Sequence, residues 1–264
     1  MLKIETEYNA SQKYNLETIF NGKLVALTLD NVARVESMIR NDSDYINSSD
    51  KSNITSSAYW MCELKKVLMV RESVLDEAYE VILRNCVKSV DRENSTHLES
   101  DGCGRNELTK RLVNIPKYQL LFYLKTPQDN DYELIKILSE ETHPTNSGTK
   151  KYHPRKNYSF ASKFCHYACF YLFEGAEEQD NFSIYDSIIG GKINDYAREF
   201  DVALPKDISS NYSSFIKTVD SIIQKSGNHI SRNGFDHLIW YFHKARKTKL
   251  GKPKTIQSRR KQNN

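Results

Sequence analysis

The chain has 264 residues, of which 39% are hydrophobic and 27% charged, a composition typical of a soluble globular protein and not of a disordered one. No apolar run approaches the roughly 20 residues that span a bilayer, and the N-terminus lacks the order of a signal peptide, so we expect no membrane partner and a cytoplasmic location. The five cysteines are scattered and odd in number, which argues against a disulfide framework, a zinc ribbon or an iron–sulfur loop.

The first half of the chain predicts helices separated by long polar loops. Residues 11–40 predict one or two helices, with Asn21-Gly22 between them. Residues 40–57 are rich in Ser, Asn and Asp, which compete for backbone hydrogen bonds and predict a loop. Ala58–Val90 repeats apolar residues at helical spacing, so it is one long helix or two abutting ones.

The second half also predicts mainly helices. A loop at residues 91–105 precedes a helical segment that Pro116 interrupts, and a short helix follows at residues 131–141. A basic loop then leads to four more predicted helices, at residues 158–173, 187–200, 213–226 and 234–245. Strand signals are sparse, so the predicted fold is all-α or mainly α.

The charge is distributed unevenly. Residues 244–264 contain nine Lys or Arg and no acidic residue, so the net charge of +4 divides into +9 for this segment and −5 for residues 1–243. We expect a flexible basic tail whose natural partner is a polyanion. A tail that only increases solubility is the alternative.

One predicted helix carries an unusual lysine. The segment "YSFASKFCHYACFYLF", residues 158–173, is apolar almost all round. On a helix starting near Tyr158, Ser162, Lys163 and His166 fall within an arc of about 100°. Such a helix lies centrally and presents its polar stripe to a cleft or to solvent.

Asp186 follows Lys163 by 23 positions, in the segment "FSIYDS". This distance accommodates the end of one helix, an acidic loop and the start of the next helix. At a helix N-terminus the Asp186 carboxylate would accept backbone N–H bonds. The structural interpretation is therefore an ordinary N-cap at Asp186 and a solvated lysine at Lys163.

The combination of "SFASK", a loop and "FSIYDS" resembles the catalytic half of helix-hairpin-helix DNA glycosylases, in particular the 8-oxoguanine-type members that use a lysine and an aspartate. The resemblance covers residues 150–200. It implies a helical bundle of two lobes with a cleft between them, with an N-terminal lobe at residues 1–145 and a catalytic lobe at residues 146–243. It also implies Lys163 as the catalytic nucleophile and Asp186 as its catalytic partner.

The sequence departs from this family in its hairpin. The glycine-rich motif Leu-Pro-Gly-Val-Gly that precedes the lysine in many members is absent, and "RKNYSFASK" stands in its place. No four-cysteine cluster follows, so the iron–sulfur branch is excluded. The resemblance implies no cofactor, no metal, a monomer, and duplex DNA with a flipped base as the partner.

The chemistry of glycosidic cleavage accounts for both residues. Positive charge develops on the sugar as the base leaves, and a nearby carboxylate stabilises it. A lysine attacks the sugar only when it is neutral, which requires burial or a neighbouring positive charge. The Schiff base that results would permit strand cleavage, so AP lyase activity can accompany base removal.

Other residues near Lys163 complete the predicted site. Phe160, Tyr167 and His166 are the candidate base pocket, because an extruded base needs aromatic and polar contacts. The predicted phosphate contacts lie upstream in a basic loop and are Lys150, Lys151, Arg155 and Lys156. The alternative is that this loop is basic only because it is solvated.

Two further functions are consistent with the same sequence. One is a helical nucleic-acid-binding protein without catalysis. The other is an interaction protein, such as a component of a bacterial defence system, in which the basic tail is incidental. The sequence does not identify the excised base.

Overall fold

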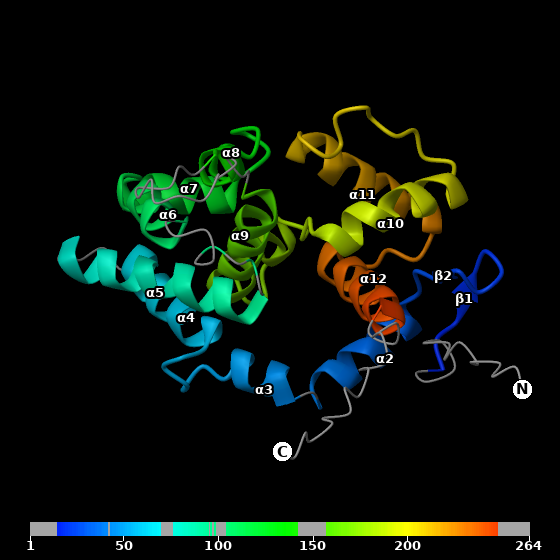
Figure 1. Cartoon of the computed structure of the whole chain (residues 1–264), viewed down its shortest axis with the longest axis horizontal. Helices are drawn as coiled ribbons and strands as arrows, with labels where there is room; N and C mark the ends of the chain where they lie inside the picture. Colours follow the sequence, from blue (N-terminus) through cyan, green and yellow to red (C-terminus); the bar gives the residue numbers. More distant parts are fainter. Residues whose placement is uncertain are drawn as a thin grey trace, which may run out of the picture.

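The structure is a computed structural model that describes residues 15–41, 43–69, 76–94, 96, 98, 104–141 and 157–247, without the side chains of residues 43–45, 76 and 245–247. These residues form eleven α-helices, one short 3-10 helix and one two-stranded hairpin (Figure 1). The prediction of a mainly helical fold is therefore confirmed.

The elements have the following bounds. The hairpin consists of β1 (Thr18–Ile19) and β2 (Leu24–Val25), and the 3-10 helix is η1 (Glu177–Asp180). The helices are α2 (Leu29–Ile39), α3 (Ser43–Ser49), α4 (Ser57–Met69), α5 (Asp76–Asn94), α6 (Gly104–Val113), α7 (Lys117–Lys125), α8 (Glu133–Ser139), α9 (Tyr158–Leu172), α10 (Ser187–Glu199), α11 (Tyr212–Ser226) and α12 (Arg232–Lys247).

The hairpin corrects the helix predicted at the start of the chain. Asn21 and Gly22 have φ angles of 54° and 77°, and Lys23 N donates to the Phe20 carbonyl at 3.2 Å. Positive φ at both central residues is the geometry of a type I′ turn, for which Asn-Gly is the preferred pair. The segment before Asn21 therefore pairs as a strand instead of continuing as a helix.

The helix α3 corrects the loop predicted at residues 40–57. Its seven residues are helical, and local contacts of Asp and Asn side chains follow where it ends. There Asp50 accepts a hydrogen bond from Ser52 N, and Asn53 accepts one from Thr55 N. Both contacts are local turns of the kind that Asp and Asn favour.

α9 occupies the centre of the molecule (Figure 1). It packs against α4, α5, α7 and α8, whereas α12 packs against α2, β2, α10 and α11. The N-terminal helix α2 therefore joins the C-terminal helices, and this packing does not follow the predicted division into residues 1–145 and 146–243. Gly234 permits the close approach, because a Cβ atom there would lie 3.2 Å from the Val32 side chain.

The end of the described chain also differs from the prediction. α12 continues to Lys247, so residues 244–247 are helical although the sequence places them in the flexible tail. Residues 248–264 lie outside the described part of the chain. Among the residues that the structure describes, none of the helices has the length and apolar character needed to cross a membrane.

The Tyr196 hydroxyl connects the hairpin to the C-terminal helices. It is buried, accepts a hydrogen bond from Val25 N at 3.1 Å and lies 3.4 Å from Nε2 of His243. We expect Tyr196→Phe to lower the free energy of unfolding by about 1–3 kcal/mol, because the buried Val25 N–H loses its partner. Thermal unfolding should show a fall in Tm of about 2–4 °C per kcal/mol, whereas Tyr118→Phe, at a residue that is 77% exposed, should leave Tm unchanged.

Candidate functional site

Lys163 lies on the central helix α9 and is buried, with 8% of its surface exposed. Its Nζ is 3.8 Å from Oδ2 of Asp186 and donates to the Asn94 carbonyl at 3.5 Å. Asn94 is the last residue of α5, so the ammonium group lies between the end of α5 and the start of α10. The alternative prediction from the sequence, that Lys163 is solvated, is therefore wrong.

Asp186 is the N-cap of α10, and its two carboxylate oxygens have different partners. Oδ1 accepts hydrogen bonds from the backbone N–H groups of Ile188 and Ile189, at 2.8 and 3.0 Å. Oδ2 faces Lys163. The predicted N-cap is thus confirmed, and it leaves one oxygen available to a charge that develops beside the lysine.

The polar stripe of α9 holds the segment that leads to Asp186. Ser162 Oγ accepts a hydrogen bond from Tyr185 N at 3.0 Å, immediately before the Lys163–Asp186 contact. One turn further along α9, Nδ1 of His166 lies 3.0 Å from the Phe182 carbonyl. Residues 182–185 therefore run antiparallel to α9, and Asp186 follows directly at the point where the Lys163 side chain reaches it.

Burial lowers the pKa of the Lys163 ammonium from its usual 10.5, because the charged form loses its hydration. The Asp186 carboxylate opposes this change, and the positive charge of Lys244 on α12 adds to it. The net effect is a lowered pKa of Lys163. The lysine therefore has a larger neutral fraction at neutral pH than an exposed lysine, as a nucleophile requires.

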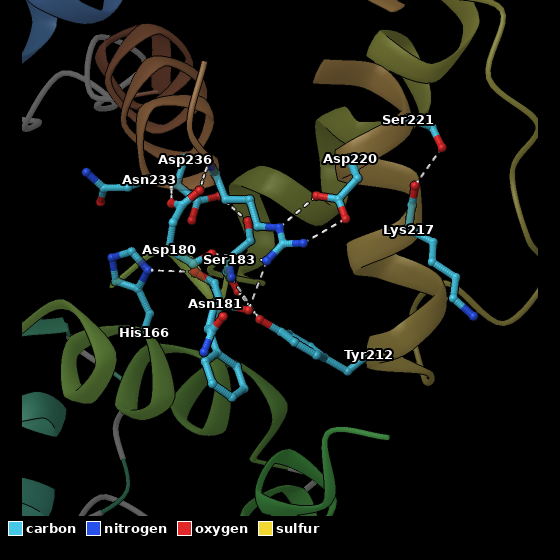
Figure 2. A network of polar contacts seen from close by, with 12 residues as sticks. His166, Asp180, Asn181, Ser183, Tyr212, Lys217, Asp220, Ser221, Asn233 and Asp236 are labelled. Atoms are coloured by element: carbon cyan, nitrogen blue, oxygen red, sulfur yellow. Dashed lines mark hydrogen bonds and ion pairs between the residues drawn. The ribbon is translucent and has the colours of Figure 1, made fainter. Parts of the chain in front are cut away.

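Asp236 on α12 fixes the middle of the same connecting segment (Figure 2). Its side chain is within 2.6 Å of both Ser183 Oγ and Ile184 N. The Tyr212 hydroxyl donates to the Ser183 carbonyl at 2.5 Å and accepts from Ser183 N. Burial raises the pKa of the Asp236 carboxyl well above 3.8, although its hydrogen bonds to Ser183 and Ile184 oppose this change, so burial favours the neutral form of this group.

Arg232 and Asp180 fix the start of the segment. The Arg232 guanidinium pairs with both oxygens of Asp220, each at 2.7 Å, and also donates to the Asp180 and Asn181 carbonyls. The Asp180 carboxylate accepts from the backbone N–H groups of Arg232 and Asn233. The N-terminus of α12 and the segment before α10 are therefore held together by charge-assisted hydrogen bonds.

The three predicted base-pocket residues have different surroundings in the structure. Phe160 lies in the core, with its ring 6.0 Å from that of Phe164. Tyr167 is one turn from Lys163, and its hydroxyl donates to Oδ1 of Asn94, whose carbonyl also binds Lys163. His166 is buried against the Phe182 carbonyl. Tyr167 and His166 thus share a helix face with Lys163.

The predicted phosphate contacts Lys150, Lys151, Arg155 and Lys156 lie outside the described residues. Several residues of the site were not identified from the sequence. Asn94 and Asp236 contact segments far from them along the chain, and neither lies in a local motif. Lys244 was predicted to lie in the tail. The apolar periodicity that precedes it could have predicted that the helix continues through Lys244.

The chain matches no protein-family model, and comparisons with curated proteins and with solved structures give no significant match. Within the described residues no group of three His, Cys, Asp or Glu side chains is arranged to hold a metal ion. The geometry of the Lys163–Asp186 pair and its supporting contacts is therefore the basis for a functional proposal.

Asp236 offers a test of how the connecting segment is held. Asp236→Asn should change the free energy of unfolding by less than about 1 kcal/mol, because an amide can donate to Ser183 Oγ and accept from Ile184 N. Asp236→Ala should lower it by about 3 kcal/mol, because both partners lose their hydrogen bonds in a buried site. Urea unfolding near neutral pH measures both values, and equal losses in the two variants would contradict a neutral carboxyl.

The same residue predicts a pH dependence of stability. The pKa of Asp236 is higher in the folded protein than the 3.8 of an exposed carboxyl, so folding takes up a proton between these two pKa values. The free energy of unfolding contributed by this group is therefore complete below pH 3.8 and decreases as the pH rises towards the folded pKa. Relative to Asp236→Asn, the natural protein should lose stability over this range, as urea unfolding at a series of pH values measures.

Proposed function

We propose that the protein is a DNA glycosylase, in which Lys163 attacks the sugar of an extruded nucleotide and Asp186 stabilises the charge that develops there. The observation that carries the proposal is the meeting of a buried lysine and a buried carboxylate at 3.8 Å. The resemblance of the "SFASK" and "FSIYDS" segments to 8-oxoguanine-type glycosylases supports the same assignment.

Lys163 has the properties of an amine nucleophile. In the proposed reaction its neutral Nζ forms a bond to C1′ of the sugar while the electron pair of the C1′–N bond leaves with the base. The proton released from Nζ goes to the carboxylate or to the departing base. Burial favours the neutral amine, and the Asn94 carbonyl accepts a hydrogen bond that orients Nζ.

Asp186 acts through charge and position. The cap hydrogen bonds to Ile188 N and Ile189 N fix the carboxylate, so no reorganisation is needed when positive charge develops on the sugar. The Nζ electron pair then forms a C1′=N bond while the C1′–O4′ bond breaks and O4′ takes a proton, which opens the sugar ring to an imine. Loss of a proton from C2′ with departure of the 3′ phosphate from C3′ is the AP lyase step that can follow.

The helix packing suggests how DNA would bind. In this proposal α4–α9 form one lobe, α2 and α10–α12 form the other, and the Lys163–Asp186 pair lies where α9 approaches α10. The basic segments around Lys150–Lys156 and residues 244–264 would contact phosphates on either side of the extruded nucleotide. The protein would act on duplex DNA as a monomer without a cofactor.

Reductive trapping tests the nucleophile. Incubation of the natural protein with borohydride and duplex DNA that contains an abasic site should give a covalent adduct, because the imine is reduced to a stable amine. Lys163→Ala should give none, since no amine remains at that position. The matched control is Lys192→Ala, an exposed lysine of α10 that pairs with Asp195, and it should be trapped normally.

Asp186→Asn separates the cap from the charge. An Asn retains an oxygen for the N-cap, so the free energy of unfolding should stay within about 1 kcal/mol of the natural value. Glycosidic cleavage should nevertheless fall by about 100-fold or more, because the carboxylate charge is lost. If Asp186→Asn and the natural protein cleave a modified base at the same rate, Asp186 has only the structural role.

The pH dependence of trapping tests the neutral lysine. Trapping by cyanoborohydride should increase with pH and reach its plateau below the pH at which an exposed lysine does, because the pKa of Lys163 is lowered. Lys244→Gln removes a neighbouring positive charge and should move the midpoint of this profile to higher pH. Lys192→Gln is the control of equal charge change, and an identical shift in both variants would contradict a local effect of Lys244.

A further inference from the structure

One face of α12 lies opposite the polar stripe of α9. Asn233, His237, Trp240 and Lys244 follow one another at intervals of four, three and four residues, which places them on one side of a helix. Nζ of Lys244 lies 3.7 Å from the centre of the Trp240 ring, and this contact holds the lysine on that face.

Electrostatic interactions link the two helices at two places. The charge of Lys244 acts on Lys163, while His166 acts on His237 and interacts with the Asn233 side chain. His166 and Asn233 lie at the same edge of the polar network, one from each helix (Figure 2).

Two polar atoms on this face of α12 have no hydrogen-bond partner of normal geometry among the described residues. They are the buried Oδ1 of Asn233 and Nδ1 of His237, and the Asn233 side chain also lies close enough to His166 to oppose, in part, the lowering of the pKa of that ring by burial. A buried polar atom without a partner costs free energy, and most such atoms in folded proteins are paired. The two atoms lie one helical turn apart, beside His166, and each retains the capacity to pair with a polar group.

The chemistry of this place differs from that around Lys163. Burial and, to a smaller extent, His166 lower the pKa of His237 to about 3, so the ring is neutral at physiological pH. A neutral imidazole has one donor and one acceptor nitrogen, and the Asn233 amide also offers both kinds of group. Two lysines lie at the other end of the α9–α12 contact, at positions 163 and 244.

We propose that Asn233 and His237 recognise the hydrogen-bonding edge of the base that Lys163 releases. This inference rests on the proposed function and adds the residues that select the substrate. A nucleobase is uncharged and carries N–H and carbonyl groups along one edge, which neutral Asn and His side chains pair with. A phosphate instead requires cations that are free to bind it, and the cation nearest to Asn233, the Arg232 guanidinium, is already paired with both oxygens of Asp220.

The test separates recognition of the base from chemistry at the sugar. The substitutions are Asn233→Leu and His237→Leu, which remove the polar atoms, and His237→Asn, whose amide places a polar atom where Nδ1 lies. Each variant is assayed on duplexes that contain 8-oxoguanine, hypoxanthine, uracil or 5-hydroxymethylcytosine. The same variants are trapped by borohydride on a duplex with a preformed abasic site, which has no base to recognise.

We expect both leucine variants to excise the preferred base about 10- to 100-fold more slowly, the effect of losing one hydrogen bond in a buried site. His237→Asn should recover most of this loss. All three variants should be trapped on the abasic duplex at a rate within about twofold of the natural protein, because Lys163 and Asp186 are unchanged.

The outcomes distinguish this inference from the proposed function. Natural rates of excision in both leucine variants would overturn the inference and leave the proposed function in place. An equal fall in excision and in trapping would also overturn it, because the residues would then support the fold or the lysine. A natural protein that is trapped but excises none of the four bases contradicts the inference alone. A natural protein that is neither trapped nor active contradicts the proposed function itself.

Discussion

The alignment of residues 182–186 along the polar stripe of α9 determines the geometry of the candidate site. Ser162 holds Tyr185 through its backbone N–H, and the next residue on each side forms the Lys163–Asp186 pair. Because Asp186 directly follows Tyr185 and is fixed as the N-cap of α10, its carboxylate lies within reach of the Lys163 side chain. The buried Asp236 carboxyl and the Arg232 guanidinium hold this alignment from the opposite side.

The site also illustrates how a buried lysine is tolerated. Removal of an ammonium group from water is costly unless it is paired or neutral, and here both solutions are present. Asp186 and the Asn94 carbonyl favour the charged form, while burial and Lys244 favour the neutral one. Because its pKa is lowered, Lys163 loses a proton at lower cost than an exposed lysine, as an amine that must be neutral in order to react requires.

The sequence predicted the parts of this site that depend on local pattern. The apolar character of α9, the N-cap at Asp186 and the interruption at Pro116 follow from residue type and spacing. Contacts between distant segments could not be predicted, because nothing near Asn94 or Asp236 indicates their partners. The hairpin was missed for a different reason: the Asn21-Gly22 turn was treated as a break between helices, although its positive φ angles favour paired strands.

The two parts of the α9–α10 connection differ in how they should tolerate a change of length. Around Gly175, whose φ is +83° and whose missing Cβ would contact nothing within 4 Å, an extra residue has room to loop outward. Between Phe182 and Asp186 an extra residue would move Tyr185 away from Ser162 and from Gly190, against which its ring packs. Related chains can therefore vary in the acidic first part of this connection, whereas the spacing of its last five residues is fixed by the pitch of the helix beside them.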